Sequence, residues 1–125
     1  GSGYNAALIS KLIGSKGKLY TLEIIPELAE NAKKKLKKFR NVKVIQKDGS
    51  EGLKEKAPFD RIAQTAASKS LQKNLIKQLK ISGIYLAPVG PSNESQKLIK
   101  VRKTKQGIKY QSLGDFIFVP LVKKV

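Results

Sequence analysis

The sequence predicts an α/β fold, a doubly wound sheet of parallel strands that finishes in antiparallel strands. Three observations support this prediction. Strand-like and helix-like patterns of apolar residues alternate over residues 3–90, which is typical of parallel sheets covered by helices. The chain opens with a glycine-rich turn that leads directly into a helical pattern. After residue 93 two strand-like segments follow around a short turn, which indicates a hairpin at the edge of the sheet.

The first half of the chain is expected to hold two helices and two strands. Residues 5–13 form a short helix that ends at Gly14. Its apolar stripe consists of Leu8, Ile9, Leu12 and Ile13. A strand is expected over residues 18–24, and a lysine-rich helix then begins at a proline and continues over residues 26–40. Residues 42–46 form the next strand.

The second half is expected to alternate in the same way before it ends in the hairpin. Its elements are a polar loop at 47–52, a strand at 59–65, an amphipathic helix at 71–79, a strand at 84–89, and hairpin strands at 96–103 and 108–119. Residues 84–89 are apolar on both faces, as in a buried parallel strand. The absence of a repeat or a linker predicts a single domain over residues 1–125.

The composition excludes several kinds of chemistry. The chain has no cysteine and no histidine, which excludes disulfides, thiolate metal sites, and a cysteine nucleophile or histidine base from this chain. What stays open is chemistry performed by a cofactor, or by carboxylates and hydroxyls. We therefore expect no metal site and no catalytic side chain of the usual acid–base kind.

The charge balance points to anionic partners. Lysine and arginine outnumber aspartate and glutamate 26 to 9, for a formal net charge of +17 at pH 7. The densest run, Lys33–Arg40, falls on the polar face of a predicted helix, and no aromatic residues interleave with it. Nucleic acid is therefore the less favoured partner. No run approaches the roughly 20 apolar residues of a membrane helix and no signal-peptide pattern opens the chain, so we expect a cytoplasmic protein without a membrane partner.

Three features lie where parallel strands are expected to end. The turn Gly1-Ser2-Gly3 offers backbone amides to a ligand, and Glu23 follows 20 residues after Gly3, at the end of the next strand. There, a carboxylate can accept hydrogen bonds from both hydroxyls of a ribose. Asp48-Gly49 follows the next strand along the same edge, where its carboxylate can accept from an adenine amino group. A plain helix-start turn, a surface glutamate and an Asp-Gly turn are the structural alternatives.

With these motifs the sequence resembles the protein-L-isoaspartate O-methyltransferase family along nearly its whole length. The matching segments are Gly1-Ser2-Gly3-Tyr4-Asn5-Ala6-Ala7-Leu8, Leu22-Glu23-Ile24-Ile25-Pro26-Glu27-Leu28-Ala29, Asp48-Gly49-Ser50-Glu51-Gly52, Ala57-Pro58-Phe59-Asp60-Arg61-Ile62 and Phe118-Val119-Pro120-Leu121. The glycine motif is generic to S-adenosylmethionine enzymes, whereas the last three segments are more particular to this family.

The resemblance implies a Rossmann-like sheet and methyl transfer from S-adenosylmethionine to the carboxylate of L-isoaspartyl residues in damaged proteins. The cofactor residues that it implies are Gly1, Ser2, Gly3, Glu23, Ile24, Asp48 and Gly49. Thr65, Ala66 and Ala67, together with the Val119-Pro120-Leu121 segment, would border the methyl acceptor. A carboxylate that attacks a sulfonium methyl group is a competent nucleophile once it is positioned and desolvated, so the lack of histidine is no objection.

The sequence departs from the family in three respects. The first strand of the family and the segment upstream of it do not precede the glycine motif, so we expect a chain that is incomplete at its N-terminus, folds poorly alone and is inactive by itself. Gln64 is polar where the family has an apolar strand. Ile81-Ser82-Gly83 replaces a Pro-Gly-Gly turn. The open alternatives are a tRNA methyltransferase of related fold, suggested by the +17 charge, and a truncated relative that binds without catalysis.

Overall fold

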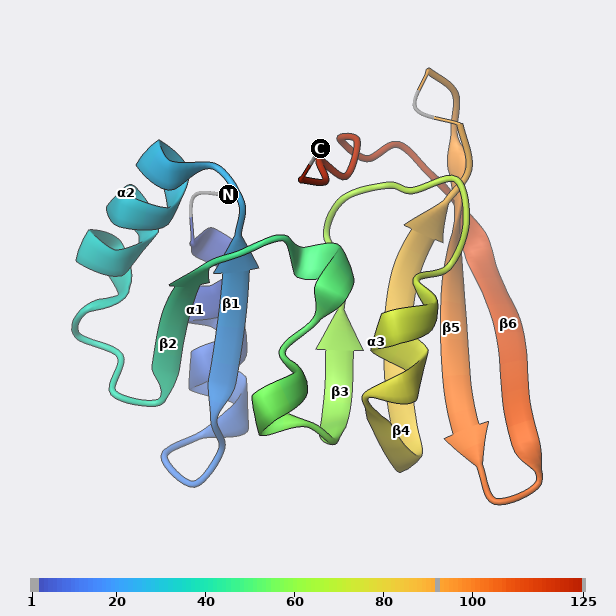
Figure 1. Ribbon diagram of the computed structural model, residues 1–125, viewed down its shortest axis with the longest axis horizontal. Coiled ribbons are helices and arrows are strands. Elements are labelled where there is room, and N and C mark those ends of the chain that lie inside the picture. The colour runs from blue at the N-terminus through green and yellow to red at the C-terminus, as the bar shows by residue number, and fades with distance from the viewer. Residues whose placement is uncertain (1–2, 92, 125) are drawn as a thin grey trace. The chain divides into compact units, whose positions relative to one another are not determined.

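The computed structural model describes residues 3–91 and 93–124, in which helices and strands alternate before a C-terminal hairpin (Figure 1). The chain divides into two compact units. The first unit comprises Gly1–Gly49 and Lys123–Val125, and the second comprises Ser50–Val122. The expected fold class, α/β with antiparallel C-terminal strands, is confirmed. The expectation of a single domain stays a prediction.

The first unit consists of two helices that pack on a pair of parallel strands. Its elements are α1 (Tyr4–Ile13), β1 (Leu19–Glu23), α2 (Pro26–Leu36) and β2 (Val42–Gln46). The strands pair in register from Leu19 opposite Val42 to Glu23 opposite Gln46. The core joins both helices to the strands through buried Ala6, Ala32 and Leu36, with Leu19, Phe39, Val42 and Val44 packed around them.

Two expectations for this unit need correction. Helix α1 buries Ala6 and Ser10, whereas Leu12, of the expected apolar stripe, is 85% exposed. Ala6 packs with Ala32 and Leu36 of α2, and the Ser10 hydroxyl bonds to Asn41, so these two contacts decide which face of α1 is buried. Helix α2 ends at Leu36 and does not continue to residue 40. The chain turns there because the amide of Phe39 bonds to the carbonyl of Leu36 at 2.9 Å.

The early end of α2 places the Asn41 side chain against the end of α1. The Asn41 Nδ2 group donates to the carbonyls of Ser10 at 3.0 Å and Gly14 at 2.9 Å, and the Ser10 hydroxyl donates to Asn41 Oδ1. Ser10 lies in the last turn of α1 and Gly14 directly follows the helix, so Asn41 adds donors to the backbone acceptors at the end of α1. A longer α2 would carry Asn41 away from this position, so the tertiary contact overrides the helical pattern of the sequence.

The second unit is a four-stranded mixed sheet with one short helix. Its elements are the 3-10 turn η2 (Lys54–Lys56), β3 (Phe59–Ala63), α3 (Lys73–Lys77), β4 (Leu79–Val89), β5 (Gln96–Thr104) and β6 (Gly107–Phe116), while η1 (Gly49–Glu51) begins at the last residue of the first unit. The strand order is β3-β4-β5-β6, with β3 parallel to β4 and the other pairs antiparallel. Leu75 of α3 joins the buried cluster of Leu79, Tyr85, Ala87 and Val101.

Strand β4 begins five residues earlier than expected, at Leu79, and α3 is correspondingly shorter. A bulge in β4 permits this extension. Leu79 pairs with Phe59 and Ile84 pairs with Arg61, so β4 advances five residues where β3 advances two. Ser82 takes a positive φ of 70° in the bulge. At Gly83 an added Cβ would lie 2.8 Å from the Lys80 carbonyl oxygen and from Leu79 side-chain atoms, so this position requires glycine.

Among the described residues, no helix has the length and apolar character needed to cross a membrane.

Candidate functional site

The expected cofactor residues that the structure describes lie at the carboxyl edge of β1 and β2. Glu23 is the last residue of β1, and Asp48 follows the end of β2 by two residues. Because the two strands are parallel and paired up to Glu23 and Gln46, both carboxylates leave the same edge of the sheet. Helix α1 begins at this edge too, as Figure 1 shows beside the arrowhead of β1. Gly1 and Ser2, also expected at this site, lie outside the described residues.

Gly3 connects the glycine turn to α1 and has a structural reason to be glycine. It precedes the first residue of the helix with a φ of 87°, in the left-handed region. Its carbonyl accepts the Ala7 amide at 3.0 Å, the first hydrogen bond of the helix. An added Cβ would lie 3.2 Å from Leu36 Cδ1 and 3.7 Å from Ala32 Cβ. Gly3 thus brings the start of α1 against α2, and the amides of the first helical turn point toward the carboxyl edge.

Glu23 is held by the backbone that follows it. Its Oε1 accepts a hydrogen bond from the Ile25 amide at 3.0 Å, and its own carbonyl accepts the Lys47 amide at 3.1 Å. The residue is half-buried, as is its neighbour Ile24. A carboxylate fixed in this way at a sheet edge can accept hydrogen bonds from two adjacent hydroxyls, since each oxygen offers two lone pairs.

Asp48 and Gly49 form the second part of the edge. Asp48 is only 7% exposed, and its Oδ2 accepts the backbone amide of Lys124 at 3.0 Å. Gly49 has no positive φ, and an added Cβ would meet only Leu22 Cβ, at 3.9 Å. Folding therefore does not require glycine at position 49, unlike at Gly3. A bare backbone beside a buried carboxylate suits the close approach of a flat ring that has both donor and acceptor groups, such as adenine.

The residues expected to border the acceptor come together in the second unit. Ala67 pairs with Pro120 in a parallel bridge, in which its amide donates to the Val119 carbonyl and its carbonyl accepts the Leu121 amide, both at 2.6 Å. Thr65 is exposed, Ala66 is half-buried and Val119 is 69% exposed. The loop after β3 and the segment after β6 thus form one surface, which we call the acceptor edge (residues 65–67 and 119–121).

Buried glutamines that the sequence did not single out hold the loops of this unit. Gln96 is fully buried, donates to the carbonyls of Pro91 and Glu94 at 2.7 Å, and accepts the Phe118 amide at 2.8 Å. Gln78 donates to the Glu51 carbonyl at 2.9 Å and accepts the Leu53 amide at 2.8 Å. The only available signal in the sequence was a glutamine directly beside apolar strand residues. A strand pattern alone does not reveal which loop such a side chain reaches.

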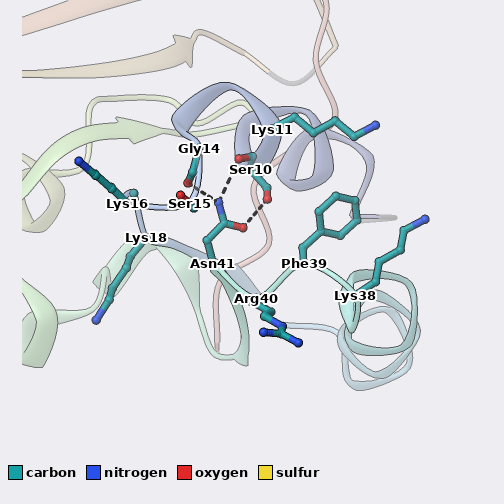
Figure 2. Close-up of a pocket in the computed structure, with 11 residues that line it drawn as sticks. Ser10, Lys11, Gly14, Ser15, Lys16, Lys18, Lys38, Phe39, Arg40 and Asn41 are labelled. Carbon is teal, nitrogen blue, oxygen red and sulfur yellow. Dashed lines mark hydrogen bonds between the residues drawn. The ribbon is translucent and has the colours of Figure 1, made fainter.

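The opposite edge of the first unit carries a basic hollow of about 520 Å³, drawn in Figure 2. Its cations are Lys11, Lys16, Lys18, Lys38 and Arg40. In Figure 2 these five side chains point outward in different directions, while Asn41 in the centre points toward Ser10 and Gly14. The polar centre therefore serves to end α1, and the cations do not converge on one point. Among the residues that the structure describes, none of those expected at the site lines this hollow.

The carboxyl edge has the donor and acceptor set that an adenosine-bearing cofactor requires. Glu23 and Asp48 are acceptors for hydroxyl and amino groups, and the start of α1 supplies backbone amides. Within residues 3–91 and 93–124, no cluster of three or more acidic, histidine or cysteine side chains is arranged to hold a metal ion. The two carboxylates and the helix amides fit an organic cofactor that is bound by hydrogen bonds.

Comparison with known proteins points to one family. A family model described as protein-L-isoaspartate(D-aspartate) O-methyltransferase matches residues 1–125. The chain is 44% identical to the protein-L-isoaspartate O-methyltransferase of Ignicoccus hospitalis and 46% identical to that of Methanosarcina mazei, over 99% of its length in both comparisons. It covers 60% and 51% of those two proteins, so the chain spans between half and two thirds of the relatives that it matches.

Solved structures give the same result. One protein-L-isoaspartate O-methyltransferase superimposes with a TM-score of 0.89 at 26% identity, over 96% of this chain and 39% of the other. A Plasmodium falciparum protein assigned to the same activity, in complex with S-adenosyl-L-homocysteine, superimposes with a TM-score of 0.77 at 25% identity, over 95% of this chain and 59% of the other. The likeness thus extends over nearly the whole chain.

Proposed function

Because the chain belongs to the protein-L-isoaspartate(D-aspartate) O-methyltransferase family, we propose that the protein methylates L-isoaspartyl residues of damaged proteins with S-adenosylmethionine as the methyl donor. The substrates are then peptides and proteins that contain isoaspartate. The observation that carries the proposal is the pair of carboxylates, Glu23 and Asp48, at the ends of adjacent parallel strands beside the start of α1. The Plasmodium falciparum structure, bound to S-adenosyl-L-homocysteine, supports the choice of cofactor.

Each residue of the carboxyl edge has a proposed role toward the cofactor. Gly1, Ser2 and Gly3 approach it with their backbone. Glu23 accepts hydrogen bonds from the ribose hydroxyls, and Ile24 lies next to it. Asp48 and the Gly49 amide bind the adenine. When bound, S-adenosylmethionine supplies an electrophilic methyl group on a positively charged sulfur.

The acceptor edge has a different proposed role, which is to orient the isoaspartyl carboxylate. An oxygen of that carboxylate would take the methyl group that the cofactor supplies, so that a methyl ester would form and the electron pair of the broken bond would stay on sulfur. No proton moves in this step, and the chain needs no general base. The proposed role of Thr65, Ala66 and Val119 is to hold the acceptor in line with the methyl group and to exclude water. Both effects lower the activation free energy of the transfer.

The test is methyl transfer by the complete protein that contains this chain. Two peptides are compared that differ only in having an isoaspartyl or an aspartyl residue, and unmodified tRNA is the third substrate. Methylation of the isoaspartyl peptide alone supports the proposal. Methylation of tRNA alone selects the related tRNA methyltransferase, which the +17 charge favours. Binding of S-adenosylhomocysteine without transfer to any substrate selects the non-catalytic relative.

A cytoplasmic location stays a prediction, which microscopy of the tagged protein checks.

A further inference from the structure

A buried polar pair lies directly behind the acceptor edge. Tyr85, on β4, is fully buried within the main cluster of the second unit. Its hydroxyl donates to Oε1 of Gln64, the residue that follows β3, at 2.5 Å. The backbone amide of Gln72 lies 3.4 Å from the same hydroxyl and donates to it. An otherwise apolar core therefore contains one phenol, whose hydroxyl hydrogen is directed at a single glutamine.

The other end of the Gln64 side chain reaches forward into the loop. Its Nε2 donates to the Ala66 carbonyl at 2.6 Å and to the Ser68 hydroxyl at 3.0 Å. The Ser68 hydroxyl in turn donates to the Ser70 carbonyl at 2.7 Å. Both hydrogens of the Gln64 amide and its oxygen thus have partners. A continuous series of hydrogen bonds runs from the core at Tyr85 to the loop at residues 66–70.

The loop that this series reaches is anchored on its far side by backbone bonds. Ser68 donates to the Pro88 carbonyl at 3.1 Å and accepts the Gly90 amide at 2.9 Å, while Ala67 pairs with the segment after β6. Residues 65 and 66 lie between these anchors and the end of β3. The Gln64 amide bonds across this interval to the Ala66 carbonyl, and it thereby fixes the direction in which Thr65 leaves the strand.

A purely structural core would not need this pair. Burying a hydroxyl and an amide costs free energy unless both are hydrogen-bonded, and apolar residues of similar size would fill the space without that cost. Burial raises the pKa of Tyr85 to about 12, even though the hydrogen bond from the Gln72 amide acts to lower it. The hydroxyl therefore stays protonated near neutral pH and donates continuously. It holds Gln64 in one orientation and takes no part in proton transfer.

We propose that Gln64 and Tyr85 are positioning residues, which hold residues 65–67 in the orientation that the methyl acceptor requires. This inference rests on the proposed function. Displacement at a methyl carbon needs the attacking oxygen in line with the sulfur, and an error of about 1 Å in placement can cost on the order of a hundredfold in rate. A rigid series of hydrogen bonds from the core to the acceptor edge reduces such errors. The pair acts through the loop and does not touch the substrate.

Three variants of the complete protein test the inference. Tyr85→Phe removes only the hydroxyl, Gln64→Leu removes the amide, and the double variant removes both polar partners together. Each single variant should be less stable, and its kcat/KM for the isoaspartyl peptide should fall about tenfold or more. The affinity for S-adenosylhomocysteine should not change. In the double variant part of the stability should return, because Tyr85 and Gln64 no longer leave each other unpaired, while the Gln72 amide and the Ala66 carbonyl still lose a partner. The value of kcat/KM should stay low.

Leu75→Ala is the matched control. It opens a cavity in the same cluster as Tyr85 and leaves the hydrogen bonds in place, so it should lower stability without the same loss of kcat/KM. The inference is overturned if the double variant regains kcat/KM together with stability, or if the control loses as much as the single variants. If the wild-type protein methylates no peptide, the proposed function fails. Amide hydrogen exchange then decides whether Gln64 and Tyr85 hold the loop at residues 65–67. Faster exchange of the Ala67 and Ser68 amides in the single variants supports this role, and unchanged exchange contradicts it.

Discussion

The carboxylate of Asp48 accepts a hydrogen bond from the backbone amide of Lys124, with 3.0 Å between Oδ2 and the nitrogen. The two residues are 76 positions apart in the sequence, yet both belong to the first unit. Asp48 is the residue that we propose binds the adenine. This amide already bonds to Oδ2, one of the two oxygens that would accept from the adenine amino group, so we expect the two donors to compete.

Replacing Lys124 with proline tests this competition. Proline has no amide hydrogen, so Lys124→Pro should remove this hydrogen bond and raise the affinity for S-adenosylhomocysteine by about tenfold or more, as expected for one hydrogen bond to a charged group. Lys124→Ala keeps the amide, removes the same side chain and should bind like the wild type. Calorimetric titration of both variants measures the difference. Equal affinities of the proline and alanine variants would contradict the competition.

Glu23→Gln should weaken cofactor binding by about tenfold to a hundredfold. The substitution removes the negative charge and one acceptor oxygen at the position proposed for the ribose, and hydrogen bonds to charged groups contribute about 1.5–3 kcal/mol. Glu27→Gln is the control. Glu27 is exposed in the first turn of α2, and its substitution removes the same charge four residues away from Glu23. The measurement is again the dissociation constant of S-adenosylhomocysteine. A loss of affinity as large in the Glu27 variant would indicate a general charge effect.

The two glycines of the carboxyl edge should respond differently to alanine. Gly3→Ala should destabilise the protein by roughly 1–2 kcal/mol, because the residue has a φ of 87° and its Cβ would lie 3.2 Å from Leu36. Gly49→Ala should leave stability nearly unchanged, since its Cβ would meet only Leu22, at 3.9 Å. It should nevertheless weaken cofactor binding. Urea unfolding and calorimetry of both variants separate the two effects, and equal destabilisation would show that Gly49 is structural too.

Tyr85 should make stability fall at high pH. Burial raises its pKa to about 12 in the folded protein, above the ordinary value of 10.0 for tyrosine, so the folded state holds its proton more tightly than the unfolded state. The stability linked to this proton is fully present below pH 10 and is lost as the pH rises through 12, by roughly 2–3 kcal/mol for two pH units. The quantity to measure is the difference between wild type and Tyr85→Phe in unfolding free energy from pH 8 to 12. A difference that does not change with pH would contradict the buried phenol.

Local patterns predicted most of the elements. The strand at residues 42–46 has its expected bounds, α1 ends at Gly14 as expected, and Pro26 opens α2. These features depend on the backbone conformations that glycine and proline adopt and on the spacing of apolar residues along the chain. Each segment contains this information by itself. The sequence also placed Glu23 and Asp48 at strand ends, from which their common edge follows as soon as the two strands are parallel.

Where the expectations were wrong, distant residues decide the structure. The apolar stripe of α1 gives way to Ala6, which packs with α2, and to Ser10, which bonds to Asn41. Helix α2 stops at Leu36, and Asn41 reaches the end of α1. Strand β4 starts at Leu79 because a bulge and Gly83 let it pair with Phe59. Asn41 and Phe59 lie outside the helices and the strand that they change, so no local period could indicate these contacts.

The sequence by itself determined the fold class, the order of the elements and the family, because motifs and periodicity are properties of consecutive residues. Only the tertiary structure decided how Gln64 is used. In the sequence it is a polar residue at the end of an apolar strand, with no visible partner. In the structure Tyr85, 21 positions later, donates to it, and it carries that contact to Ala66. A hydrogen bond needs two groups at a set distance and angle, and only the folded chain brings them there.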